Sequence, residues 1–277
     1  YTMPDTLSLH DALPISLGGR CFEYWSEDPY LAGHEAVGIV AGVQSKGVGT
    51  SLKHFAANNQ ETDRLRVSAN ISQRALREIY FPAFEHIVKT AQPWTIMCSY
   101  NRINGVHSAQ NRWLLTDVLR DEWGYEGIVM SDWGADHDRV ASLNAGLNLE
   151  MPPSYTDDQI VYAARDGRIQ PEQLDRMAQG MVDLVNKTRA AMSVENYRFD
   201  VDAHDEVAHQ AAFEYMVLLK NDGNILPVAA NAKIAVIGEF ARTPRYQGGG
   251  SSHITPTKMT SFLDTLAERG ADVTFAP

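Results

Sequence analysis

Residues 127–135 of the chain read GIVMSDWGA, and this stretch decides the fold class that the sequence predicts. Ile128, Val129 and Met130 form a short apolar run after a glycine, which is typical of a strand covered on both faces. Asp132 follows near the C-terminal end of that strand. Because the carboxyl ends of parallel strands face the ligand crevice in α/β folds, Asp132 is a candidate for chemistry. The alternative is that Asp132 caps the helix that comes next.

Short apolar strands alternate with amphipathic helices on both sides of this stretch, which predicts βα units and a parallel sheet. The expected strands are residues 48–55, 94–99, 128–130 and 147–151, and the expected helices are residues 72–90, 111–123 and 137–145. Pro82 predicts a bend or break in the first of these helices. The spacing indicates a sector of a (β/α)8 barrel, since a complete barrel needs about 250 residues.

A second α/β domain is expected toward the end of the chain. Residues 155–188 and about 205–219 read as helical, residues 233–237 as a strand and residues 256–269 as a helix. We predict a partial (β/α)8 barrel domain over 17–190, an interdomain linker with a helix over 191–232, and the start of a C-terminal domain over 233–277. Residues 1–16 (YTMPDTLSLHDALPIS) show no periodicity that extends beyond residue 16, so we expect a non-native leader on an internal fragment.

Charge and composition limit the classes of function. The 277 residues carry a formal net charge of −11, which argues against nucleic acid and anionic membranes as partners. The two cysteines, Cys21 and Cys98, cannot build a disulfide framework or a CxxC metal site. The histidines show no HxH or HExxH spacing, so we predict no metal and no cofactor. No membrane span or signal peptide is visible, which favours a cytoplasmic location, and a homo-oligomer stays open.

Polar and aromatic side chains follow several of the predicted strands. They are Arg20, Lys53, His54, Met97, Tyr100, Asp132 and Trp133. If the strands are neighbours, their ends converge on one pocket, where charged groups bind sugar hydroxyls and aromatic faces cover the apolar side of the ring. Cations beside Asp132 favour its ionised form, which a nucleophile needs. The alternatives are a surface pair of Arg20 with Glu23 or Glu27, a solvated strand end at Lys53, and Met97 as core filler.

A glycine-rich loop, QGGGSSHI at residues 247–254, follows the strand at 233–237. A phosphate-binding loop has to be considered, because such loops precede helix N-termini. The stretch matches neither GxGxxG nor GxxxxGK[ST], and it begins ten residues after the strand. A loop that carries Ser251 or Ser252 toward a ligand is the favoured interpretation, and nucleotide binding is the alternative.

Five longer motifs together resemble the β-glucosidases of glycoside hydrolase family 3. The motifs are GGRCFEYWSEDPYLAG, GVQSKGVGTSLKHFAANNQET, IMCSYNRING, LLTDVLRDEWGYEGIVMSDWGA and VLLKNDGNILPV, and the resemblance runs from about residue 18 to the end. It implies a (β/α)8-type barrel followed by an α/β sandwich domain, with the active site between them. It also implies Asp132 as the nucleophile that forms a glycosyl-enzyme intermediate.

The resemblance implies roles for the other site residues as well. Arg20, Lys53, His54 and Tyr100 match groups that bind the sugar hydroxyls in the −1 subsite, Met97 lies beside them, Trp133 borders the leaving-group side, and Ser251 lies on a loop from the second domain. The implied mechanism is retaining, with two carboxyl groups roughly 5 to 5.5 Å apart. The resemblance places the acid/base Glu beyond residue 277 and a sugar-binding Asp upstream of residue 18.

Two local features select among branches of this family. The loop AANNQETD after His54 lacks the His–Asp dyad of the N-acetylglucosaminidase branch, and Trp133 favours the glucosidase branch over the xylosidase branch. Asn148 stands where the family usually has an acid. The sequence therefore predicts a fragment of a retaining β-glucosidase that acts on small-molecule or oligosaccharide β-glucosides. The alternatives are a catalytically inactive carbohydrate-binding remnant and a β-xylosidase of the same family.

Overall fold

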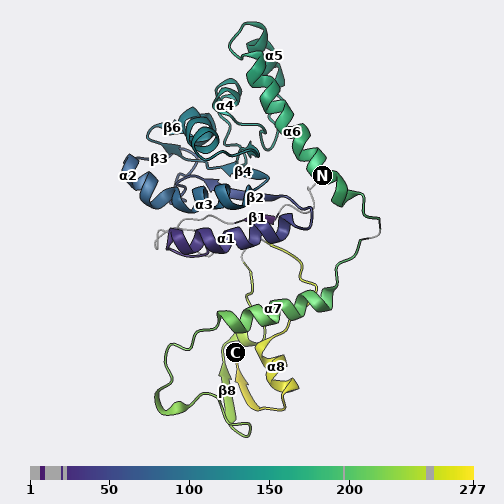
Figure 1. Ribbon diagram of the computed structural model, residues 1–277. Coiled ribbons are helices and arrows are strands. Elements are labelled where there is room, and N and C mark those ends of the chain that lie inside the picture. Colours follow the sequence, from purple (N-terminus) through teal and green to yellow (C-terminus); the bar gives the residue numbers. More distant parts are fainter. Residues whose placement is uncertain (1–6, 10–19, 21–23, 196, 248–252) are drawn as a thin grey trace. The chain divides into compact units, whose positions relative to one another are not determined.

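The computed structural model describes residues 7–9, 20, 24–195, 197–247 and 253–277 (Figure 1). The chain divides between Glu195 and Asn196 into two compact units. Among the described residues, no helix is long and apolar enough to cross a membrane.

The first unit contains a four-stranded parallel sheet in the order β1–β2–β4–β7. The strands are β1 Leu7–Leu9, β2 Thr50–Phe55, β4 Thr95–Cys98 and β7 Ile128–Met130. Every residue of β4 and β7 is buried, as expected for strands with cover on both faces. The sheet confirms the predicted sector of a (β/α)8-type barrel. The expected strand at 147–151 is reduced to one parallel bridge between Met130 and Leu149.

Strand β1 lies within residues 1–16, which the sequence analysis expected to be a leader and left out of the fold. Leu7–Leu9 pair in parallel with Thr50–Leu52 of β2. A short apolar LSL segment satisfies the backbone groups of the β2 edge, which would otherwise lack partners on that side. The lack of a longer periodicity concealed this pairing, because three residues are too few to show alternation.

Helices connect the strands and cover the sheet. They are α1 Pro29–Gln44, α2 Gln73–Ala75, η2 Leu76–Tyr80, α3 Pro82–Ala91, η4 Trp113–Glu122 and α4 Arg139–Ala145. The helical stretch predicted over 72–90 is interrupted before Pro82, which begins α3, as the sequence indicated. Segments η2 and η4 are π-helical, with Phe81 N bonded to Leu76 O. Gly124, at φ +72°, follows η4 in the left-handed conformation that glycine accepts readily.

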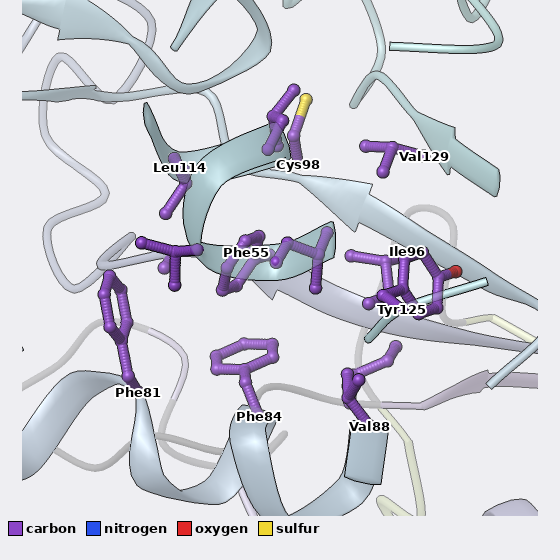
Figure 2. Close-up of a cluster of buried hydrophobic side chains, with 14 of the residues drawn as sticks. Phe55, Phe81, Phe84, Val88, Ile96, Cys98, Leu114, Tyr125 and Val129 are labelled. Atoms are coloured by element: carbon purple, nitrogen blue, oxygen red, sulfur yellow. The ribbon is translucent and has the colours of Figure 1, made fainter. Parts of the chain in front are cut away.

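The core between the sheet and these helices is built around aromatic rings (Figure 2). Phe55 of β2 is fully buried, and its ring centroid lies 5.1 Å from Phe84, 5.6 Å from Trp123 and 5.9 Å from Phe81. Figure 2 shows Phe81 and Phe84 reaching up to Phe55 from α3 and the residue before it. This packing fixes β2 against the helices, and therefore the position of His54, which precedes Phe55 in the chain.

A small second sheet lies in the connections after β2 and β4, and the sequence analysis did not predict it. Its strands are β3 Ser68–Ala69, β5 Arg102–Ile103 and β6 Val106–His107, followed by the 3₁₀ turn η3 Ser108–Gln110. Asn104 and Gly105 form the turn of the β5–β6 hairpin with φ values of +50° and +91°. An Asn-Gly pair is the strongest short hairpin signal, so RINGVH did carry the information.

Two helices end the first unit, α5 Asp157–Arg165 and α6 Pro171–Met192. The single helical stretch predicted over 155–188 is split, because Gly167 takes φ +78° between them. Pro171 stands at the first turn of α6, where its fixed φ suits the helix.

The second unit contains the two-stranded parallel sheet β8 Lys233–Ile237 and β9 Asp272–Ala276. Its other elements are α7 Val201–Tyr215, η5 Asp222–Asn224, η6 Glu239–Ala241 and α8 Phe262–Glu268. Helix α8 begins later than predicted because Ser261 forms a capping box with Asp264. Helix α7 instead begins earlier than the predicted position 205, because the side chain of Asp200 accepts the N–H of Ala203 and caps the helix there.

Candidate active site

Asp132 lies two residues after β7, at the C-terminal end of the sheet, and only 7% of it is exposed. Its Oδ1 accepts the backbone N–H of Trp133 at 2.7 Å, and its Oδ2 lies 3.4 Å from Nε2 of His54. The side chain of Asp138 caps helix α4 by accepting the N–H groups of Val140 and Ala141. The alternative role of Asp132 as the helix cap is therefore wrong, since another aspartate fills it.

The cations and the imidazole come from β2 and from the chain before α1. His54 is 3% exposed, and its Nε2 lies 3.4 Å from a terminal nitrogen of Arg20. Lys53 precedes it in β2 and is half-buried. Because β4 lies between β2 and β7 in the sheet, the ends of three neighbouring strands supply this group. The structure thus brings His54 and Asp132 together with Arg20, as the sequence analysis expected of strand ends.

Tyr100, two residues after β4, completes the contact with Asp132 and is 7% exposed. Burial raises the pKa of Tyr100 to about 12, and the negative charge of Asp132 and a hydrogen bond with its side chain act in the same direction. The phenol therefore keeps its proton at neutral pH, so that the hydroxyl group donates and the carboxylate of Asp132 accepts.

Arg64 and Glu61 belong to this site, and sequence reasoning missed them. The guanidinium carbon of Arg64 lies 4.7 Å from the centroid of the Tyr100 ring, in a cation–π arrangement. A terminal nitrogen of Arg64 donates to Oε2 of Glu61 at 2.7 Å, which fixes the guanidinium over the ring. The available signal was the charged string ETDR at residues 61–64, soon after the strand that carries His54.

The remaining predicted site residues differ in how far they are buried. Met97 is 7% exposed in β4 and pairs in register with Met130 of β7, so it lies inside the sheet close to the strand ends. Trp133 is 52% exposed, which leaves its indole accessible beside Asp132. Ser251 and Ser252 lie outside the described residues. Near them in sequence, the side-chain amide of Gln247 pairs with the backbone N–H and carbonyl of Ile254, both at 2.8 Å.

A network of charges fixes the loop after Asp132. Arg139 reaches Asp136 at 3.3 Å, Glu150 at 3.4 Å and Asp157 at 3.2 Å. The Asp136 side chain is 1% exposed and also accepts the hydroxyl of Ser142 at 2.7 Å. Buried carboxylates of this kind require such partners, so the loop has one well-defined arrangement.

The described residues contain no group of three or more His, Cys, Asp or Glu side chains that could hold a metal ion. The site is instead a buried carboxylate with a phenol, an imidazole and two arginines nearby, and with an accessible indole at its side. A carboxylate held in this way can act as a nucleophile, and the surrounding donors can bind hydroxyl groups.

Comparison with known proteins gives the family. Residues 15–184 match the Glycosyl hydrolase family 3 N terminal domain, and residues 216–274 match the Glycosyl hydrolase family 3 C-terminal domain. The chain belongs to glycosyl hydrolase family 3. The motifs around His54 and Asp132 indicated the same family.

Relatives within family 3 carry two different activity names. The chain is 86% identical over 270 residues to an exo-α-(1→6)-L-arabinopyranosidase of Bifidobacterium breve, covering 94% of this chain and 36% of that protein. It is 49% identical over 258 residues to thermostable β-glucosidase B of Acetivibrio thermocellus, covering 92% of this chain and 34% of that protein. The chain thus spans about a third of the length of these relatives.

Solved structures of family 3 share the fold. A GH3 β-glucosidase of Bifidobacterium adolescentis superposes with a TM-score of 0.93 at 92% identity, covering 98% of this chain and 40% of that one. β-Glucosidase 3B of Thermotoga neapolitana, in complex with α-D-glucose, superposes with a TM-score of 0.89 at 39% identity, covering 96% of this chain and 38% of that one.

Proposed function

We propose that the chain is the part of a retaining β-glucosidase that carries the nucleophile, Asp132. The observation that supports this most directly is the position of the Asp132 carboxylate. It is nearly buried at the end of β7, 3.4 Å from Nε2 of His54 and close enough to Tyr100 for its charge to raise the pKa of that hydroxyl group. The β-glucosidase names among relatives and solved structures support the same choice of sugar.

The proposed reaction has two steps. One carboxylate oxygen of Asp132 attacks the anomeric carbon of a β-D-glucoside, the bond from that carbon to the leaving-group oxygen breaks, and a glycosyl ester forms. Water then attacks the same carbon, releases glucose and restores the carboxylate. The Tyr100 hydroxyl donates to Asp132 before the attack, while Arg20, Lys53 and His54 bind hydroxyl groups of the sugar. We assign no residue of this chain as the acid that protonates the leaving group.

A second candidate activity is the cleavage of α-L-arabinopyranosides, and the 86% identity to the Bifidobacterium breve enzyme favours it. In their chair forms, a β-D-glucoside and an α-L-arabinopyranoside both carry an equatorial glycosidic bond. A single nucleophile can therefore attack either anomeric carbon from the same side. The two sugars differ in the orientation of the hydroxyl at C4 and in the hydroxymethyl group at C5, which only the glucoside has. Specificity then depends on the groups around C4 and C5.

The test uses 2,4-dinitrophenyl β-D-glucoside, whose leaving group needs no protonation. We expect a burst of dinitrophenol, stoichiometric with the folded chain, that is absent from Asp132→Ala. Asp138→Ala is the matched control, because it removes a carboxylate from the other end of the same loop without touching the site, and it should keep the burst. A folded wild-type chain that releases no dinitrophenol would refute the proposal for this chain and favour an inactive carbohydrate-binding remnant.

The two sugars are compared by the same assay with 2,4-dinitrophenyl α-L-arabinopyranoside. A larger kcat/KM for the glucoside supports the first candidate, and a larger kcat/KM for the arabinopyranoside supports the second. Loss of both bursts in Asp132→Ala would show that one nucleophile serves both substrates. Mass spectrometry of the denatured chain after the burst should find the sugar on the peptide that contains Asp132.

A further inference from the structure

Tyr100 is a partner of Asp132 whose backbone is not part of a strand of the main sheet. It lies in the short segment between β4, which ends at Cys98, and β5, which begins at Arg102. Its hydroxyl must nevertheless stay beside Asp132, whose charge raises its pKa, and its ring must stay under Arg64. Something other than the sheet therefore has to fix the peptide groups of Tyr100 and Asn101.

Two consecutive residues at the end of the β5–β6 hairpin hold the carbonyl groups of Tyr100 and Asn101. The ring of His107 contacts the Tyr100 carbonyl through Nδ1 at 3.4 Å. Ser108 donates to the Asn101 carbonyl twice, from its hydroxyl at 3.0 Å and from its backbone N–H at 3.1 Å. Ser108 is fully buried, so water does not compete for these bonds.

The hydroxyl of Ser108 also connects this clamp to the ends of β2 and β4. It lies 2.7 Å from the hydroxyl of Ser99, which in turn donates to the Ala56 carbonyl at 2.8 Å. The two hydroxyls have two protons for three contacts, so the proton of Ser108 is divided between Ser99 Oγ and the Asn101 carbonyl. Removal of the Ser108 hydroxyl would thus leave the Asn101 carbonyl with only the Ser108 backbone N–H, and would remove the contact of Ser99 Oγ with Ser108.

The bonding around His107 determines its tautomer. Nε of Arg102 always carries its proton and donates to Nε2 of His107 at 3.0 Å, so Nε2 must present a lone pair. The ring proton of neutral His107 is therefore on Nδ1, the nitrogen that faces the Tyr100 carbonyl. The ring of His137, from the loop after β7, lies 4.1 Å away between centroids.

We propose that His107 and Ser108 are positioning residues for the reaction at Asp132. By holding the carbonyl groups of Tyr100 and Asn101, they keep the Tyr100 hydroxyl against the nucleophile. The inference rests on the proposed function for the role of Tyr100 in catalysis, but the clamp itself is a statement about side-chain positions. Misplacement of a site residue by about 1 Å can cost up to about a hundredfold in rate, so a loose clamp has a measurable effect.

The bond between Arg102 and His107 has a predicted pH dependence. Burial lowers the pKa of His107, the positive charges of His137 and Arg102 lower it further, and the bond to the Tyr100 carbonyl opposes them. The titratable or charged groups that act on the ring are Arg102 from β5 and His137 from the loop after β7. Above the lowered pKa the ring is neutral and accepts the Arg102 proton. As the pH falls through this pKa, a second ring proton on Nε2 faces Arg102 and the bond from Arg102 is lost, while Nδ1–H still faces the Tyr100 carbonyl.

The experiment uses two clamp variants, His107→Phe and Ser108→Ala. His107→Phe keeps an aromatic ring but removes its hydrogen-bond donor. The control is Val106→Ala, because Val106 lies in the same hairpin and is 45% exposed. The rate of Asp132 glycosylation is read from the dinitrophenol burst. We expect each clamp variant to lower it by roughly five- to fiftyfold, with little change in KM, and Val106→Ala to stay within about twofold. Because Nδ1 keeps its proton when His107 becomes charged, the wild type should stay faster than His107→Phe on both sides of the His107 pKa.

A double variant separates positioning from a general structural role. In a Tyr100→Phe background the hydroxyl is already gone, so His107→Phe should have little further effect on the rate. Equal losses with and without the Tyr100 hydroxyl would overturn the proposal, as would clamp variants with the wild-type rate.

A second measurement does not depend on turnover. The NMR signal of the Tyr100 ring, assigned by its loss in Tyr100→Phe, should shift in His107→Phe and Ser108→Ala but not in Val106→Ala. If wild type gives no burst yet this signal shifts as expected, the proposed function fails for this chain while the clamp stands. An unshifted Tyr100 signal in both clamp variants refutes the clamp whatever the activity.

Discussion

Replacement of Phe55 by alanine should destabilise the first unit more than any comparable change on its surface. Phe55 is fully buried in β2, and its ring contacts those of Phe81, Phe84 and Trp123 at centroid distances between 5.1 and 5.9 Å. Deletion of a buried Phe side chain costs about 3–5 kcal/mol, as lost transfer energy plus the cavity that remains. Three aromatic neighbours place Phe55→Ala near the upper end, at about 5 kcal/mol of unfolding free energy.

The assay is urea unfolding followed by tryptophan fluorescence. All five tryptophans lie in the first unit, at positions 25, 94, 113, 123 and 133, so their emission reports on that unit alone. With an m value of about 2 kcal/mol per molar urea, the expected loss moves the midpoint down by about 2.5 M. Phe55→Leu keeps much of the volume and should cost about 1–2 kcal/mol.

Tyr155→Ala is the control, because Tyr155 is an aromatic residue of the same unit with 88% exposure. It should change the unfolding free energy by no more than about 0.5 kcal/mol. A loss below about 1 kcal/mol for Phe55→Ala, or an equal loss for Tyr155→Ala, would show that the aromatic cluster is not what holds β2 in place. An altered m value would instead point to a change in how much of the unit unfolds.

Gly127→Ala should destabilise the first unit by several kcal/mol at 25 °C. A Cβ at residue 127 would lie 2.6 Å from the carbonyl oxygen of Trp94, and that backbone atom cannot move aside. An unfolding midpoint equal to that of the wild type in the same urea titration would contradict this. The pair of Arg77 and Glu122 should add at most about 1 kcal/mol, because 37% and 45% of the two side chains are exposed. The bond from Arg77 lowers the pKa of Glu122, so the contribution is present above the ordinary Glu pKa and is lost as the pH falls through the lowered one. Glu122→Gln should therefore lower stability at pH 7 and leave it unchanged near pH 2, and a loss that persists at pH 2 would exclude the charge as its cause.

Local patterns predicted most of the fold because each one has a local physical cause. The apolar runs of β2, β4 and β7 and the break before Pro82 all depend on residues within a few positions of each other. The hairpin of Arg102–His107 was equally local, and its Asn-Gly signal was overlooked. The pairing of Leu7–Leu9 with β2 was not predictable in this way, because it joins segments more than forty residues apart.

The residues of the candidate site were likewise predicted where the signal was local and missed where it was not. The sequence alone named Asp132, His54 and Tyr100, because each lies at or just after the end of a strand of one parallel sheet, and it named Arg20 from the motif GGRCFEYWSEDPYLAG. It could not assign the cap of α4 to Asp138 rather than to Asp132, since both precede the helix by a few residues.

By itself, the sequence determined the parallel βα sheet, the family and the chemical types of the site residues, because these follow from hydrophobic period and from motifs along the chain. The tertiary structure decided which side chains touch. Only folding brings Arg64 over the ring of Tyr100 and the His107–Ser108 clamp onto the Tyr100 and Asn101 carbonyls. These contacts depend on distances between separate loops, and such distances are set by the packing of the sheet and helices that carry the loops rather than by neighbours in sequence.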